Sequence, residues 1–175
     1  DPLWSRGLGD VYKRQLFTRS NATWSQQAYI KPSNTQANAW FGWSLALSAD
    51  GSTLAVGAMA EAGNGRGFNA NQADRSAGGA GAAYLFQRSG STWAQKAYLK
   101  APNADAGDLF GASMALSGDG KTLAIGATAE NSLTTGLQGN QADNSALPGV
   151  PSYGVPTGVG ACLLYTSPSP RDQRG

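Results

Sequence analysis

Short apolar runs alternate with turn residues along most of this chain. Four such runs follow one another within one stretch, at residues 41–48, 53–58, 81–88 and 93–100. Asp50-Gly51 lies between the first two runs and suits the positive φ of a tight hairpin. Runs of this length, bounded by Gly, Ser, Asn and Asp, predict short strands joined by hairpin turns. The low proportion of charged residues, 14%, and the 24 glycines also favour strands and turns over helices.

The same pattern of runs and turns recurs 69 residues later, where Phe110 corresponds to Phe41. Between residues 16–77 and 85–146, more than half of the aligned positions are identical. Four strands per repeat are typical of a β-propeller blade, and one blade cannot bury both of its faces alone. The repeat therefore predicts a stack of similar sheets.

We predict an all-β fold, a β-propeller fragment of four-stranded antiparallel blades, from copies of the repeat at 16–84 and 85–161. One complete blade is expected at 40–100. The outer half of the blade before it is expected at 16–31, and the inner half of the blade after it at 109–127. The remaining blades of the same chain are its expected neighbours.

Both ends of the chain resemble a translated sequencing adaptor. Codons that can encode Asp10–Gln15 are the reverse complement, shifted by one base, of codons that can encode Cys162–Ser167. We therefore expect residues 1–15 and 162–175 to be adaptor-like, and the fold prediction leaves them out. The single cysteine, Cys162, lies in this part, so no disulfide or thiolate site is expected between the two ends.

Charge and hydropathy exclude two classes of partner. Residues 16–161 contain eight Lys or Arg and eight Asp or Glu, so this segment is neutral and lacks the basic surface of a nucleic-acid-binding protein. No apolar run approaches the roughly 18 residues of a membrane-spanning helix. The segment is therefore expected to bind no nucleic acid and to contain no membrane span.

The sequence Phe-Gly-x-Ser, followed by Leu-Ala-x-Gly-Ala, resembles the FG-GAP repeat, the blade unit of integrin-α-type propellers. The resemblance covers residues 16–161. It is closest to the long-repeat version of bacterial surface and secreted proteins, with Gly-Ala-x-Tyr-x-Phe and Trp-x-Gln-x-Ala-Tyr-x-Lys segments. The resemblance implies an extracellular or cell-surface location in bacteria and a protein or glycan ligand, often with an adhesive role.

The resemblance also implies a place where calcium is often bound. Many blades of this family carry an Asp-x-Asp-x-Asp-Gly loop between their first two strands. Here that place holds a single carboxylate in each copy, Asp50 or Asp119. Calcium takes about six to eight oxygen ligands, which so short a turn does not supply. We interpret Asp50 and Asp119 as hairpin-turn residues.

A second polar element is repeated inside the long loop between the second and third strands. The tetrapeptide from Asn71 to Asp74 recurs from Asn140 to Asp143. Three interpretations are open: the side chains hold the loop in shape, they contact a neighbouring blade, or they form a weak cation site. For the last, the candidate Ca²⁺ ligands are Asp74, Asp143, Asn71 and Asn140.

Candidate catalytic residues are few. The chain has no histidine, which removes the commonest general base. Asp105 and Asp108 share a loop in which the other copy has Gln36 and Ala39. A catalytic carboxylate pair and a solvated loop are both open readings of these two residues. No catalytic residue and no firm cofactor are predicted, and we expect a non-enzymatic protein.

Aromatic residues supply the remaining candidates. The repeated aromatics of the fourth strand are Trp24, Trp93, Tyr29 and Tyr98. Packing between blades and a sugar-stacking platform are both open for them. Trp40 and Trp43 correspond to Leu109 and Ala112 in the second copy, so the two tryptophans do not belong to the repeat pattern. Trp43 is predicted to face the central channel.

Taken together, these features predict a non-enzymatic extracellular or cell-surface binding or adhesion module. Loops 59–80 and 128–159 are its expected contact surface, because loops on a rigid scaffold commonly carry binding residues. Two alternatives are open. One is a non-catalytic propeller part of a larger secreted carbohydrate-active enzyme, and the other is a purely structural surface repeat.

Overall fold

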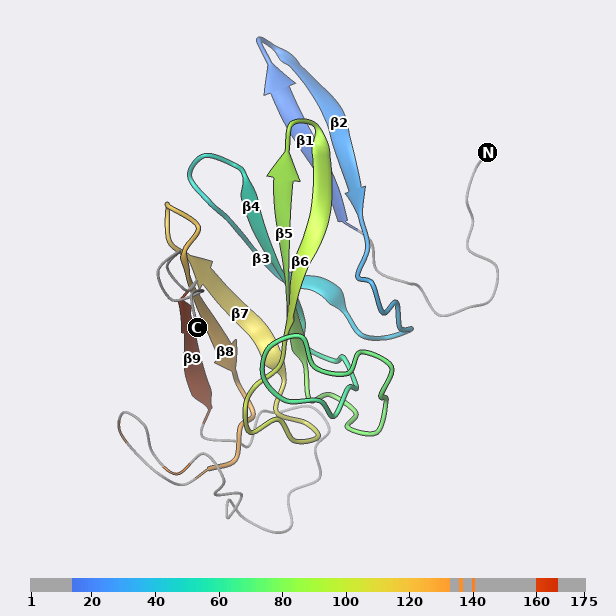
Figure 1. Cartoon of the computed structure of the whole chain (residues 1–175), viewed down its shortest axis with the longest axis vertical. Helices are drawn as coiled ribbons and strands as arrows, with labels where there is room; N and C mark the ends of the chain where they lie inside the picture. Colours follow the sequence, from blue (N-terminus) through green and yellow to red (C-terminus); the bar gives the residue numbers. More distant parts are fainter. Residues whose placement is uncertain (1–13, 133–135, 137–139, 141–159, 167–175) are drawn as a thin grey trace, which may run out of the picture.

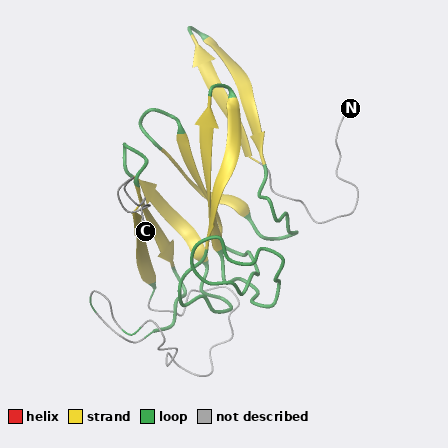
Figure 2. Ribbon diagram, in the orientation of Figure 1, coloured by secondary structure: helices red, strands yellow, loops and turns green. Residues whose placement is uncertain are grey.

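The computed structural model describes residues 14–132, 136, 140 and 160–166, and strands are the regular elements of this part of the chain (Figures 1 and 2). The nine strands are β1 (Arg14–Ser20), β2 (Thr23–Ile30), β3 (Phe41–Leu47), β4 (Thr53–Ala58), β5 (Ala82–Ser89), β6 (Thr92–Leu99), β7 (Phe110–Leu116), β8 (Thr122–Ala127) and β9 (Ala161–Thr166). They form three antiparallel sheets, in the orders β1-β2, β3-β4-β5-β6 and β7-β8-β9. Within these residues there is no helix with the length and apolarity of a membrane span.

The middle sheet is the complete four-stranded blade that the sequence predicts, with strand ends within about two residues of those expected. Strand β4 lies between two partners, and its residues from Leu54 to Ala58 are all buried. A strand covered on both faces needs a continuous apolar run, which the Leu-Ala-x-Gly-Ala segment supplies. The conserved spacing of the two copies places β8 in the same position of the third sheet.

The third sheet has one strand more than the predicted half-blade. Strand β9 begins at Ala161 and runs into the segment that the sequence prediction set aside as adaptor-like. Ala127 pairs with Ala161, as Ala58 pairs with Ala82 in the middle sheet, so β9 occupies the position of β5. The physical reason is that β8 presents an open edge, and an apolar segment in reach can pair with it. The pairing does not test where these residues come from, and the adaptor interpretation stays a prediction.

The two glycines of the repeat motif allow the sheets to approach closely. Gly111 has φ +88° at an irregularity of β7, and a Cβ there would lie 2.5 Å from the carbonyl oxygen of Ala82. A Cβ at Gly57 would collide with the carbonyl oxygen of the same Gly111. That oxygen accepts a hydrogen bond from Ser44 Oγ at 2.6 Å. The Phe-Gly and Gly-Ala ends of the motif therefore mark the contact between neighbouring blades.

The two hydrophobic cores lie between the sheets. Phe41, Val56 and Tyr84 belong to a buried cluster that also includes Ile30 of β2, so it joins the first two sheets. Phe110 belongs to a second cluster, which joins the second and third sheets. Burial between sheets, with little core inside any one of them, is the packing expected of stacked blades.

The two ends of the strands differ in their connections. The hairpin turns β1–β2, β3–β4, β5–β6 and β7–β8 lie toward the upper end of the molecule in Figure 1, and the long segment 59–81 lies at the lower end. Phe41 pairs with Ala58, the last residue of β4, so β3 begins at the lower end. We call this end, which carries segment 59–81 and the start of β3, the loop face.

Candidate binding face

Segment 59–80 on the loop face is held against the outermost strand of its own blade. The backbone N–H of Asn69 donates to the carbonyl oxygen of Tyr98 at 2.7 Å, and Lys100 N–H donates to Gly67 at 2.9 Å. Asn69 Oδ1 in turn accepts a hydrogen bond from Tyr98 N–H at 3.0 Å. The segment therefore has a defined path, although it contains no strand of its own.

The repeated polar tetrapeptide makes local turns within this segment. Asp74 Oδ1 accepts hydrogen bonds from Ser76 N–H and Ser76 Oγ, both at 2.7 Å. These bonds, chiefly the one from the Ser76 hydroxyl, lower the pKa of the Asp74 carboxyl. Asn71 Oδ1 accepts from Ala73 N–H at 2.9 Å. This geometry supports the interpretation that the side chains shape the loop.

Of the other candidate metal ligands, Asn71 lies in the same segment as Asp74. Asn140 is exposed, and Asp143 lies outside the described residues. Across residues 14–132 and the short described pieces beyond them, no three His, Cys, Asp or Glu side chains gather into a group that could hold a metal ion. The calcium prediction therefore gains no cluster of ligands here and stays untested.

Asp50 and Asp119 lie at their hairpin turns in identical hydrogen-bond networks. Asp50 Oδ1 accepts from Ser48 Oγ at 2.6 Å and from Ser52 N–H at 3.0 Å. Asp119 Oδ1 accepts from Ser117 Oγ at 2.6 Å and from Lys121 N–H at 3.1 Å. The serine hydroxyl contributes most to lowering the pKa of Asp50, to about 2, and it lowers that of Asp119 as well.

A buried ion pair that the sequence prediction missed supports the loop face. Lys100 Nζ lies 3.0 Å from Glu61 Oε2, and both side chains are fully buried. The same carboxylate accepts hydrogen bonds from Tyr98 Oη at 3.0 Å and from Gly63 N–H at 2.9 Å. Burial lowers the pKa of Lys100, and the charge of Glu61 acts against this. The carboxylate is thus paired and hydrogen-bonded, as a buried charge must be.

The equivalent carboxylate of the second copy has a similar surrounding. Asn103 Nδ2 donates to Glu130 Oε1 at 3.0 Å, as Asn34 Nδ2 donates to Glu61 Oε1 at 3.2 Å. Ser132 N–H also donates to Glu130 at 3.1 Å. The sequence did carry a signal for this network, because the Asn, the Glu and the Lys recur unchanged in both copies of a chain with few charges.

The candidate carboxylate pair is divided by the structure into two different environments. Asp108 is 2% exposed, and its Oδ2 accepts a hydrogen bond from the backbone N–H of Asp105 at 2.8 Å. Burial raises the pKa of the Asp108 carboxyl to about 6. Asp105 is partly exposed and forms an ion pair with Arg66 at 3.5 Å. Asp108 is therefore buried, and its carboxylate stabilises the turn at Asp105 through this hydrogen bond. The interpretation of this loop as solvated does not hold for Asp108.

Trp40 and Trp43 form an exposed aromatic pair on the loop face. Their ring centroids lie 5.4 Å apart with an interplanar angle of 25°, and the side chains are 39% and 57% exposed. Trp43 N–H donates to the carbonyl oxygen of Trp40 at 3.0 Å, so a backbone turn fixes the spacing of the two rings. The structure places both residues at the start of the innermost strand β3.

The repeated aromatics have mixed roles. Tyr98 is fully buried in the core between the first two sheets, whereas Tyr29 is 44% exposed. Trp93 Nε1 donates to Gln27 Oε1 at 3.2 Å and so links the second blade to the first. Trp24 is 64% exposed on β2. Packing between blades therefore describes Trp93 and Tyr98.

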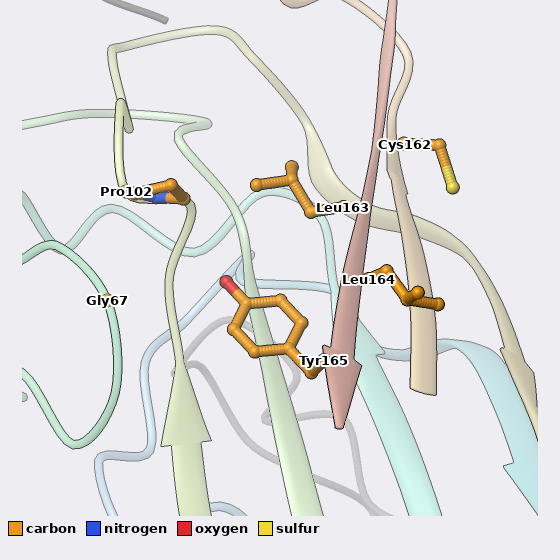
Figure 3. A pocket seen from close by; sticks show the side chains of 6 residues that line it. All are labelled: Gly67, Pro102, Cys162, Leu163, Leu164 and Tyr165. Carbon is orange, nitrogen blue, oxygen red and sulfur yellow. The ribbon is translucent and has the colours of Figure 1, made fainter. Parts of the chain in front are cut away.

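A pocket of about 320 Å³ opens beside β9 (Figure 3). Leu163 and Tyr165 project from the strand toward Pro102, whereas Cys162 and Leu164 lie on its other side. The Tyr165 hydroxyl already donates to the carbonyl oxygen of Lys100 at 2.9 Å. The pocket therefore lacks the convergent polar groups of a small-molecule site.

Comparison with known proteins places this geometry in a family. The family model of the FG-GAP repeat matches residues 24–86 and 93–142, which is more than half of the chain. Among curated proteins, no match to this chain is found. The two matched segments follow the two copies of the repeat, and the three antiparallel sheets are consistent with blades of a β-propeller fragment. The chain belongs to the FG-GAP repeat family.

Proposed function

We propose that this chain is a non-enzymatic binding module that contacts a glycan or protein ligand through the loop face. FG-GAP repeats form propeller-type modules and are typically found in extracellular proteins. An extracellular or cell-surface binding module is therefore the function that suits both the family and the loop face. The contact is made by a rigid scaffold that presents segment 59–80 and the tryptophan pair.

The observation that carries this proposal is the exposed stack of Trp40 and Trp43. The second copy has Leu109 and Ala112 at these positions, so the blade does not need tryptophan there. Tryptophan is enriched at binding hot spots, because it offers a large rigid surface with one hydrogen-bond donor. Such rings, held by a backbone turn, are suited to stack on a sugar ring or to receive an apolar side chain.

Rigidity of the surrounding loop supports the same function. Backbone hydrogen bonds fix segment 59–80 to β6, and the buried ion pair between Glu61 of the segment and Lys100 after β6 also holds it. A loop that is already ordered loses less conformational entropy when it binds a ligand. The loop face therefore provides an aromatic anchor beside a pre-ordered polar surface.

Affinity electrophoresis of the whole chain tests this proposal. Native gels containing xylan, chitin, laminarin or pectin, and surfaces coated with mucin or fibronectin, serve as probes. We expect at least one probe to retain the protein, and Trp40→Ala or Trp43→Ala to weaken that retention by about tenfold or more. Trp24→Ala removes a more exposed tryptophan away from the loop face and is expected to have no effect. Equal losses in all three variants, or no retention by any probe, would refute the proposal.

A further inference from the structure

Asn64 and Gly65 form the only Asn-Gly pair of the sequence, and they lie in segment 59–80 of the loop face. Asn64 is exposed. Within the part of the chain that the structure describes, the Asn64 side chain makes no hydrogen bond or ion pair, and the backbone N–H of Gly65 donates to no protein group. The pair therefore combines an unrestrained side-chain amide with an unengaged backbone nitrogen on the residue that follows it.

We propose that Asn64 is a site of spontaneous deamidation, which converts it to a mixture of aspartate and isoaspartate. The backbone nitrogen of Gly65 attacks Cγ of Asn64, since glycine has no Cβ to hinder this approach. The new N–Cγ bond closes a five-membered succinimide, the bond from Cγ to Nδ2 breaks, and ammonia leaves with the proton from the Gly65 nitrogen. Water then opens the ring at Cγ to give aspartate, or at the backbone carbonyl to give isoaspartate. Water is the only co-reactant.

The two Asp-Gly pairs of the chain show what restrains this chemistry. Gly51 N–H donates to the carbonyl oxygen of Ser48, and Gly120 N–H donates to that of Ser117, both at 2.9 Å. The carboxylates of Asp50 and Asp119 are also held by hydrogen bonds that lower their pKa values, so they are ionised at neutral pH and resist attack by the nitrogen. Neither restraint is present at Asn64.

The other asparagines of the same segment are restrained as well. Asn69 Oδ1 accepts a hydrogen bond from Tyr98 N–H at 3.0 Å, and Asn71 Oδ1 accepts one from Ala73 N–H at 2.9 Å. Each is followed by a residue with a side chain, which hinders ring closure. The structure therefore distinguishes Asn64 from its neighbours by exposure, by its lack of partners and by the glycine that follows.

Isoaspartate at this position would affect the anchoring of segment 59–80, because it adds one carbon to the backbone. Before Asn64, Gly63 N–H donates to the buried Glu61 carboxylate at 2.9 Å. After it, the Gly67 carbonyl oxygen accepts from Lys100 N–H at 2.9 Å. Gly65 lies close to Ala70, since a Cβ at Gly65 would be 2.6 Å from Ala70 Cβ. The extra atom has to fit between these fixed points, and we expect it to loosen the bond from Lys100 to Gly67.

Peptide mass spectrometry of the full chain, incubated at mildly alkaline pH with and without urea, tests the proposal. In the folded chain we expect the mass gain of about one dalton that accompanies deamidation to appear at Asn64 at least about tenfold faster than at Asn69 or Asn71. Unfolding in urea should change the rate at Asn64 by less than about threefold, whereas isoaspartate at Asp50 and Asp119 should form mainly in urea. An Asn64 that stays intact in the folded chain but deamidates in urea would overturn the proposal.

Two variants separate Asn64 from other sources of negative charge. Anion-exchange chromatography of the incubated chain is expected to resolve a species with one additional negative charge. Asn64→Gln should remove this species, because the longer side chain would have to close a six-membered ring. Asn71→Gln changes another exposed asparagine of the segment in the same way and should leave the species unchanged. Formation of the species in Asn64→Gln at the rate of the unmodified chain would overturn the assignment.

Hydrogen exchange tests the effect on the segment. The fraction that contains isoaspartate, identified by enzymatic methylation of its carboxylate, is separated from the fraction that contains aspartate. Exchange of the Lys100 amide is expected to be about tenfold faster or more in the isoaspartate fraction, because its hydrogen bond to Gly67 is loosened. Equal exchange in the two fractions would contradict the proposed effect on the anchoring of segment 59–80. Circular dichroism establishes that both fractions keep their strands.

Discussion

Replacing Lys100 with methionine would leave the Glu61 carboxylate buried with no cation beside it. The two charged groups lie 3.0 Å apart and both side chains are fully buried. Methionine has nearly the same length as lysine, so the change removes charge and one donor while it keeps most of the packing. The variant therefore tests the ion pair and leaves the shape of the core largely unchanged.

The expected loss of stability can be worked out from the surroundings of Glu61. Breaking a buried ion pair by removing one partner costs about 3–5 kcal/mol, because the other charge is left uncompensated. Tyr98 Oη and Asn34 Nδ2 still donate to the carboxylate in the variant, which favours the lower end of this range. A loss of about 3 kcal/mol lowers the melting temperature of a chain of this size by about 6–12 °C.

Urea denaturation followed by tryptophan fluorescence measures this loss. The matched control is the double variant Glu61→Gln with Lys100→Met, which removes both charges and is expected to lose clearly less than the single variant. A loss below about 1 kcal/mol, or a double variant as unstable as the sum of its two single variants, would refute this reasoning.

Three further predictions follow from individual contacts. Burial raises the pKa of Asp108 to about 6, so the folded state binds this proton more tightly than the unfolded state does. The contribution of Asp108 to stability is therefore complete below about pH 4 and is lost as the pH rises through 6. Asp108→Asn is therefore expected to raise stability at pH 7 by about 1–2 kcal/mol and to give no gain at pH 4, and equal effects at both pH values would contradict this. Gly111→Ala should lose about 2 kcal/mol or more in thermal unfolding, because φ is +88° and the new Cβ meets the Ala82 carbonyl. Gly118→Ala should be near neutral, because a Cβ there makes only an ordinary contact with the Ala49 side chain at 3.5 Å. Calcium or a chelator is expected to leave the melting temperature unchanged, since the carboxylates of Asp50 and Asp74 are occupied by internal hydrogen bonds, and a clear rise with added calcium would disprove this.

Periodicity within the sequence was enough to predict the blade. Two copies of four apolar runs, each run bounded by turn residues, correctly predicted the order β3-β4-β5-β6 and the hairpins within it. Hairpin pairing is local, so it can be read from neighbouring segments. The third sheet has strand β9 beside the two predicted strands, and β9 pairs with β8 from more than thirty residues away, which no local pattern reports.

The candidate site was predicted less completely. Trp40 and Trp43 were noted as departures from the repeat, but their stacking depends on a backbone turn. Glu61 and Lys100 were missed because they lie 39 residues apart and meet only when segment 59–80 folds back on β6. Asp108 was not expected to be buried, since the burial comes from the packing of its loop between two blades.

The sequence by itself determined the repeat unit, the strand type of its elements and the family, because these depend on residue order and on the period of apolar positions. The tertiary structure alone decided which face of each blade is covered and which charges are paired. Those outcomes depend on contacts between sheets and between a long loop and its own blade. The same residue types differ in them, because Lys100 is buried against Glu61, whereas its equivalent Lys31 is exposed. The Phe-Gly and Gly-Ala motif joins the two levels, since its glycines are visible in the sequence and only the close approach of Gly57 to Gly111 explains them.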